Sequence, residues 1–115
     1  MNVIVFGTGG FYQKYKEQLI MKGINIIAFT DNDLQKWGTF FEEKPVISPS
    51  EIKQIKYYDY IIVASVFWMA IEAQLLQMGI EKDKIWIPFM RKIIPQPVDD
   101  LNKIEIKRLI DKRKV

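Results

Sequence analysis

One stretch near the N-terminus, VIVFGTGGFY at residues 3–12, strongly limits the folds open to this chain. Its first four residues form a continuous apolar run, which is typical of a strand buried on both faces in a parallel sheet. Gly7 and Gly9 follow at once, and apolar residues at helical spacing begin at Phe11. The stretch therefore predicts a strand, a glycine turn and a helix. In that arrangement Gly7 permits the turn, Gly9 lets a phosphate approach the backbone, and the helix start carries about half a positive charge.

Tyr12 stands where the pattern G-x-G-x-x-G would have its third glycine. That glycine normally permits close contact between helix and strand. With Tyr12 in place, the helix shifts outward, or the ring turns into the ligand cleft, or Gly10 takes over the spacing role. A further interpretation is that the glycines serve only a tight turn in a scaffold without a ligand.

Apolar runs and helical segments continue to alternate along the rest of the chain. Five strands are expected, at residues 2–6, 25–30, 44–47, 59–65 and 84–87. The run at 44–47 is predicted to be an edge or minor strand, because Pro45 cannot donate to a central ladder. Helices are expected at residues 11–22, 51–55, 68–78 and 100–114, with glycine caps at Gly23 and Gly79.

The capping signals support the short helix at 51–55, since Ser48 precedes Pro49 and Glu51 lies three residues after Ser48. The helix at 68–78 has two possible apolar sides, one with Met69 and Leu76 and the other with Ile71 and Leu75.

Alternating strands and helices predict a three-layer α/β fold with a parallel sheet in the order of about 3-2-1-4-5. The expected domain is residues 1–90, followed by a linker and a basic helix in residues 91–115. A chain of 115 residues is the size of one domain.

Composition excludes several kinds of chemistry. The chain has no cysteine and no histidine, which removes disulfides, Cys/His zinc sites and every histidine base. Carboxylates, lysines and tyrosines remain as candidates for acid-base work, but they form no evident catalytic constellation, and we expect no catalytic residue and no metal ligand in this chain. Residues 103–115 hold six basic and two acidic side chains, so the net charge of +3 belongs to this tail. We interpret the tail as a solvated or docking helix rather than an anchor for nucleic acid. With no leader and no long apolar run, a cytoplasmic protein without a membrane span is expected.

In a doubly wound sheet, ligands bind beyond the carboxyl ends of the strands. Asp31 lies 24 residues after Gly7, a spacing typical of an acid that binds a ribose, although it could also contact a base or cap the next loop. Asp31 and Asp33 lack a third metal ligand. Ser65 could donate to a phosphate or a ribose, or only cap the following helix. Aromatic residues gather near the same edge and suggest either a stacking surface or an interface: Trp37, Phe40, Phe41, Phe67 and Trp68.

The stretches VIVFGTGG, IIAFTDNDLQKWG, KPVISPSEI, DYIIVAS and GIEKDKIWIP occur in an order and spacing that carry a family resemblance. Over about residues 1–90 the chain resembles the small Rossmann-like domains of bacterial polysaccharide and glycan biosynthesis, including the N-terminal domain of PglD-like sugar acetyltransferases. The resemblance implies a bound nucleotide or UDP-sugar, ahead of NAD(P). The binding residues it implies are Gly7, Thr8, Gly9, Gly10, Phe11, Asp31, Asn32, Ser65 and Val66.

Three functions remain open at this stage. The first is an accessory domain that holds a nucleotide or nucleotide sugar for a partner enzyme of glycan synthesis, as a homodimer or with that enzyme. The second is an interaction module with a vestigial cleft. The third is a small NAD(P)-binding oxidoreductase or redox-sensing domain, which Tyr12 opposes. The resemblance does not extend to acetyl transfer, since hexapeptide repeats and histidine are absent.

Overall fold

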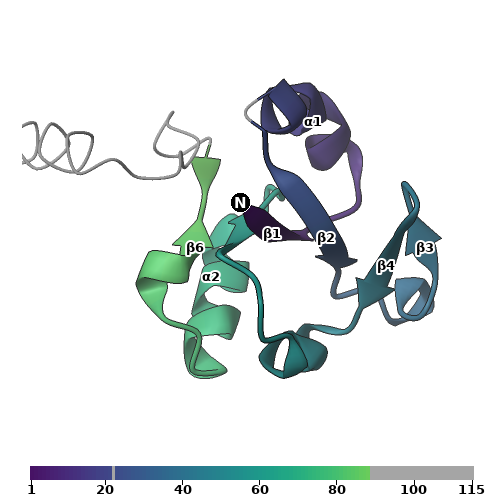
Figure 1. Cartoon of the computed structure of the whole chain (residues 1–115). Helices are drawn as coiled ribbons and strands as arrows, with labels where there is room; N and C mark the ends of the chain where they lie inside the picture. Colours follow the sequence, from purple (N-terminus) through teal and green to yellow (C-terminus); the bar gives the residue numbers. More distant parts are fainter. Residues whose placement is uncertain (22, 89–115) are drawn as a thin grey trace, which may run out of the picture.

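The apolar runs of the sequence form a six-stranded sheet in the computed structural model, which describes residues 1–21 and 23–88. The order across the sheet is β3-β4-β2-β1-β5-β6, and β1 lies between its two parallel neighbours (Figure 1). The strands are β1 (Asn2–Phe6), β2 (Asn25–Thr30), β3 (Phe40–Phe41), β4 (Lys44–Ile47), β5 (Tyr60–Val63) and β6 (Ile85–Trp86).

The observed order contains the five expected strands as predicted and one additional strand. β3 pairs with β4 in the antiparallel direction, so the sheet is mixed and β3 occupies the edge. Of the two interpretations of residues 44–47, the edge strand was wrong, whereas a minor strand fits β4, which has four residues and pairs with β2 only through Val46 and Ile47. Pro45 is nevertheless compatible with this position, because β2 pairs only with Val46 and Ile47, which follow it.

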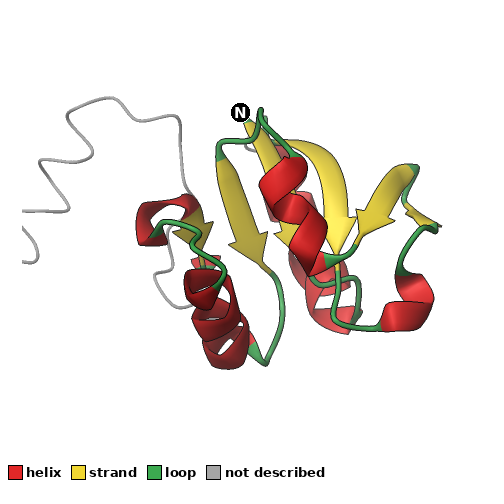
Figure 2. Ribbon diagram, turned by 90° about the horizontal axis from the view of Figure 1, so that it is seen from below, coloured by secondary structure: helices red, strands yellow, loops and turns green. Residues whose placement is uncertain are grey.

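Helices cover both faces of the sheet, with α1 on one side and α2 on the other (Figures 1 and 2). Gly23 and Gly79 have positive φ angles of 68° and 90°, as expected for glycines that end helices. Ser48 and Glu51 form the predicted capping box, although the helix is of the 3-10 type. The expected helix at 100–114 and the segment 91–115 lie outside the described residues. The helical segments are α1 (Gly10–Met21), η1 (Leu34–Lys36), η2 (Pro49–Gln54), α2 (Trp68–Gln77) and η3 (Lys82–Lys84).

Alternate residues of β1 and of β5 face opposite layers of the core. On the α1 face, Tyr12 and Leu19 pack against side chains that include Val3, Val5 and Phe29. The opposite cluster includes Ile4, Phe6, Ile52, Ile61, Ile71 and Leu75. Of the two apolar sides predicted for α2, the one with Ile71 and Leu75 is therefore buried. Among the described helices, we find none with the length and apolar character needed to cross a membrane.

Tyr12 belongs to the core and not to the ligand cleft. Its side chain is only 1% exposed, and its ring lies edge-on to Phe29 with a centroid distance of 5.0 Å. The phenol hydroxyl donates a hydrogen bond of 2.6 Å to Glu42 Oε2. A Cβ atom on Gly10 would meet nothing within 4 Å, so Gly10 does not take over the spacing role. Of the three predicted arrangements, a helix far enough from the sheet to admit an aromatic ring is the one that fits this packing.

Candidate functional site

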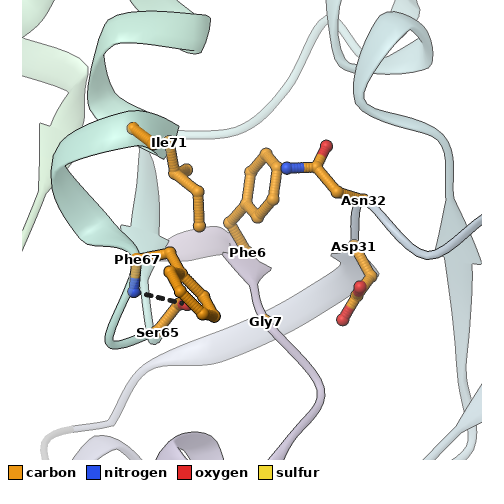
Figure 3. Close-up of a pocket in the computed structure, with 8 residues that line it drawn as sticks. Phe6, Gly7, Asp31, Asn32, Ser65, Phe67 and Ile71 are labelled. Atoms are coloured by element: carbon orange, nitrogen blue, oxygen red, sulfur yellow. Dashed lines mark hydrogen bonds between the residues drawn. The ribbon is translucent and has the colours of Figure 1, made fainter.

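A pocket of about 320 Å³ lies beyond the carboxyl ends of β1, β2 and β5. The chain reaches β2 and β5 on opposite sides of β1, so the pocket marks the point where the strand order reverses. Figure 3 shows the side chains around it. The lining residues are Phe6, Gly7, Asp31, Asn32, Ser65, Phe67, Ala70 and Ile71.

The first glycine of the loop is required by the fold itself. Gly7 has a φ of 123°, and its amide donates to Thr30 O at 2.9 Å. A Cβ atom at this position would lie 2.3 Å from the carbonyl oxygen of Ala64 on the neighbouring chain segment. No other residue type fits so close to a backbone oxygen at this φ.

The fold does not require glycine at the next two glycine positions, 9 and 10. Gly9 and Gly10 are exposed, and a Cβ atom at either position would meet nothing within 4 Å. Neither has a positive φ angle. They precede and begin α1, where the first backbone amides of a helix lack partners within the helix and attract anions. The open space therefore lies at a helix start suited to a phosphate, beside the pocket, whose lining includes only Gly7 of this loop.

Asp31 connects the end of β2 to the glycine loop. Its Oδ2 atom accepts hydrogen bonds from the hydroxyl and the amide of Thr8, at 2.8 and 3.2 Å. Its Oδ1 atom accepts from the amide of Asp33 at 2.9 Å. Asp31 thus caps its own loop, as one sequence interpretation expected, and also holds the glycine loop in place.

The electrostatics of this cluster favour an ionised carboxylate. Burial alone would raise the pKa of Asp31, but the hydrogen bonds from Asp33 and Thr8 and the charge of Lys36 together lower that pKa below its ordinary value of 3.8. The Lys36 Nζ atom lies 3.6 Å from Asp31 Oδ2 and donates to Thr8 Oγ1 at 2.9 Å. An anionic ligand approaching the loop would therefore meet a carboxylate already paired with a cation.

Lys36 is a residue that the sequence analysis missed. It lies in η1, five residues after Asp31, and its side chain is 42% exposed beside Thr8 of the glycine loop. The only signal in the sequence was the proximity of a lysine to the Asp31 turn, and lysines are common in surface loops.

The remaining predicted site residues fall into two groups. Asn32 and Ser65 line the pocket, and Ser65 Oγ accepts a hydrogen bond of 3.0 Å from the amide of Phe67. The N-cap of α2 is Phe67 and no side chain caps this helix, so the bond closes the turn ahead of α2 and the interpretation of Ser65 as a helix cap was wrong. Val66 is 69% exposed and does not line the pocket, whereas its neighbour Phe67 does. Phe11 is half-buried at the start of α1, and its ring packs against Tyr15.

The aromatic residues near this edge have different environments. Phe41 and Trp68 pack against the two core clusters, whereas Phe40 and Phe67 are 76% and 72% exposed. Trp37 donates from its indole nitrogen to Asp31 O at 2.6 Å. Only Phe67 among these five lines the pocket, so it is the candidate for stacking against a ligand ring. In the part of the chain that the structure describes, no group of three or more acidic side chains could hold a metal ion.

Several solved structures share this fold. UDP-D-quinovosamine 4-dehydrogenase from Vibrio fischeri is 17% identical with a TM-score of 0.57, and the match covers 89% of this chain and 84% of that one. RSP in complex with β-NADH is 16% identical with a TM-score of 0.54, covering 98% of this chain and 61% of RSP. RSP bound to β-NAD+ and operator DNA gives 14% identity and a TM-score of 0.55, covering 98% and 60%. The chain is thus Rossmann-like in fold and spans about three fifths of RSP.

Sequence comparison adds one family. The family described as C2185-like, N-terminal has a model that matches residues 1–86, which include every strand and helix of the described fold. Among curated proteins, none matches this sequence.

Proposed function

This chain belongs to the C2185-like, N-terminal family, and from its Rossmann-like fold and open glycine loop we propose that residues 1–90 bind a nucleotide or a nucleotide sugar. Catalysis would then come from another domain or chain. The observation that carries the proposal is the contrast within the loop. Gly7 is glycine because the fold requires it, whereas Gly9 and Gly10 face open space at the start of α1. A phosphate is a group that would use this space.

The charge distribution around the loop supports an anionic ligand. The α1 N-terminus contributes a partial positive charge, and Lys36 neutralises Asp31 beside it. A phosphate could therefore approach without facing an unpaired carboxylate. Lys36 would contact the phosphate, and Asp31 would keep Thr8 and the loop in position.

The proposed place of this domain is bacterial glycan or polysaccharide synthesis. It extends the resemblance noted in the sequence, and one finding supports it: the structural similarity to a dehydrogenase whose name contains a UDP-sugar. A pocket of about 320 Å³ is near the lower end of the range for small-molecule sites, roughly 300–1,000 Å³, which suits a mononucleotide better than a dinucleotide.

Calorimetric titration of the full chain with UDP, UDP-N-acetylglucosamine, NADH and CoA tests the proposal. We expect a response to the uridine compounds and its loss in Gly9→Val, because the valine side chain would occupy the phosphate path. Glu17→Val is the matched control, since it places the same side chain at an exposed position of α1, the helix that follows Gly9. Thermal unfolding of both variants checks that the fold is intact.

Each other outcome has a distinct meaning. Binding of NADH alone would replace the proposal with the redox function. Binding that Gly9→Val leaves unchanged would remove the glycine loop from the site. If none of the four compounds binds, the proposed function is overturned and the interaction module takes its place.

A further inference from the structure

Two side-chain amides, one of them from the pocket residue Asn32, pair with each other beside the pocket. Asn32 Nδ2 donates to Gln74 Oε1 at 3.0 Å, and Gln74 Nε2 donates to Asn32 Oδ1 at 2.9 Å. Asn32 lies in the loop after β2, whereas Gln74 lies in α2, one turn after the pocket residue Ala70. Asn32 lines the pocket and Gln74 does not, so the pair joins the loop after β2 to the helix α2 beside the pocket.

This bridge contributes little to the stability of the fold. Both hydrogen bonds are exposed, and water can satisfy the same amide groups when the pair opens. Ordering two long side chains also costs conformational entropy. A ligand that offers the same hydrogen bonds could thus replace one amide at small cost.

Each primary amide presents one donor and one acceptor side by side, so the partner of such a group must present an acceptor and a donor at the same spacing. The edges of nucleobases have this pattern. Adenine is bound in this way by asparagine and glutamine side chains, through its exocyclic amino group and a ring nitrogen. The imide edge of uracil, with a carbonyl oxygen beside an N–H group, offers the same pair of hydrogen bonds.

The rest of the pocket suits a flat ring at this position. Phe6, Ala70 and Ile71 are apolar, and the exposed ring of Phe67 also lines the space. Figure 3 shows the Asn32 amide directed toward Phe6 and Ile71, while the Asp31 carboxylate points the other way. The polar group for a base edge and the loop for phosphates therefore lie on different sides of the pocket.

We infer that Gln74 reads the edge of the nucleobase, and that its pairing with Asn32 holds this amide in place until a base replaces Asn32. The inference rests on the proposed function, since it assigns the base contact of the same site. Gln74 is thus a specificity-determining residue that sits outside the glycine loop and the Asp31 turn.

Substitution of Gln74 by methionine tests the inference, because methionine keeps a similar length and removes both hydrogen-bonding groups. Gln77→Met is the matched control, because Gln77 is an exposed glutamine in the next turn of α2, three residues after Gln74. The dissociation constants of UDP, ADP and inorganic pyrophosphate are measured by calorimetry for the wild type and both variants. For whichever nucleotide binds, we expect Gln74→Met to weaken binding by roughly tenfold or more, as for the loss of a bidentate base contact. We expect pyrophosphate to bind all three proteins equally, and Gln77→Met to bind like the wild type.

The outcomes separate the two proposals. If Gln74→Met binds the nucleotide as the wild type does, or loses pyrophosphate in equal measure, the base contact is overturned while nucleotide binding stands. If neither nucleotide binds the wild type, the proposed function fails first and the inference fails with it. A thermal unfolding curve of Gln74→Met close to that of the wild type confirms that the comparison concerns binding and not folding.

Discussion

At the scale of single residues, substitution by alanine should lower the free energy of unfolding strongly at Gly7 and hardly at all at Gly9. Gly7→Ala places a Cβ atom 2.3 Å from Ala64 O in a conformation that alanine rarely adopts. We expect the free energy of unfolding to fall by roughly 2–4 kcal/mol, as for strained backbone combined with a steric clash. Gly9→Ala meets no atom within 4 Å, and the change should stay within about 0.5 kcal/mol. Urea unfolding of the two variants beside the wild type measures both values.

Equal losses in the two variants would contradict the distinction on which the ligand proposal depends. In that case Gly9 would also serve the fold, and its open surroundings would need another explanation. A loss only at Gly7 supports the view that evolution had no packing reason to keep Gly9 free of a side chain.

At the scale of elements, the β3–β4 hairpin holds two residues in a conformation that favours glycine. Its two-residue turn consists of Glu42 and Glu43, whose φ angles are 48° and 67°. Glu43→Gly should relieve this strain and raise the free energy of unfolding by up to about 1 kcal/mol, because the gain exceeds the added entropy of the unfolded chain. The midpoint of thermal unfolding would rise by a few degrees, roughly 4–8 °C per kcal/mol for a domain of this size.

Glu42→Gly is the matched comparison, since it relieves the same kind of strain in the same turn. Glu42 also accepts hydrogen bonds from Tyr12 at 2.6 Å and Lys16 at 3.0 Å. The buried phenol of Tyr12 would lose its partner, at a cost of about 1–3 kcal/mol, so this variant should be less stable than the wild type. Stabilisation by both substitutions would mean that the bond between α1 and the hairpin contributes nothing.

The elements that the sequence predicted well are those whose signals are local. β1, β2 and β4 begin and end where their apolar runs do, and the capping residues located the helix that follows β4. β3 has two residues and depends on pairing with β4, so no periodicity could indicate it. The environment of Tyr12 depends on how α1 stands on the sheet, which sequence spacing does not fix.

In the candidate site too, residues with a local sequence signal could be predicted and residues that depend on tertiary contacts could not. Gly7 and Asp31 were predictable, because a turn at a strand end and an acid at the end of the next strand are features of the sequence itself. Lys36 and Gln74 were not, since each reaches the site only through tertiary contacts with Thr8 or Asn32. A contact between two segments that are distant in the sequence leaves no periodic pattern in either segment.

At the scale of the whole molecule, the Asp31 carboxylate connects the carboxyl ends of β1 and β2 with η1. Asp31 bonds to Thr8 in the glycine loop and pairs with Lys36. Because the pKa of Asp31 is lowered in the folded state, folding favours the ionised form and the unfolded chain binds the proton at higher pH. The stability that Asp31 contributes is therefore fully present above its ordinary pKa of 3.8 and is lost as the pH falls through the lower folded value.

Asp31→Asn should for this reason reduce the free energy of unfolding most near neutral pH, and the gap to the wild type should begin to narrow below about pH 4 and close as the pH falls through the lower folded pKa. Urea unfolding at about pH 7, 5 and 2.5 measures the gap, with Asp83→Asn as the control for the removal of one exposed carboxylate. A gap that stays constant with pH would show that the asparagine amide replaces the charge without loss and that the difference lies in packing. A gap that closes on acidification would show that the ionised carboxylate of Asp31 holds the glycine loop in place. An anionic ligand that draws Lys36 away from Asp31 would then change the free energy of unfolding.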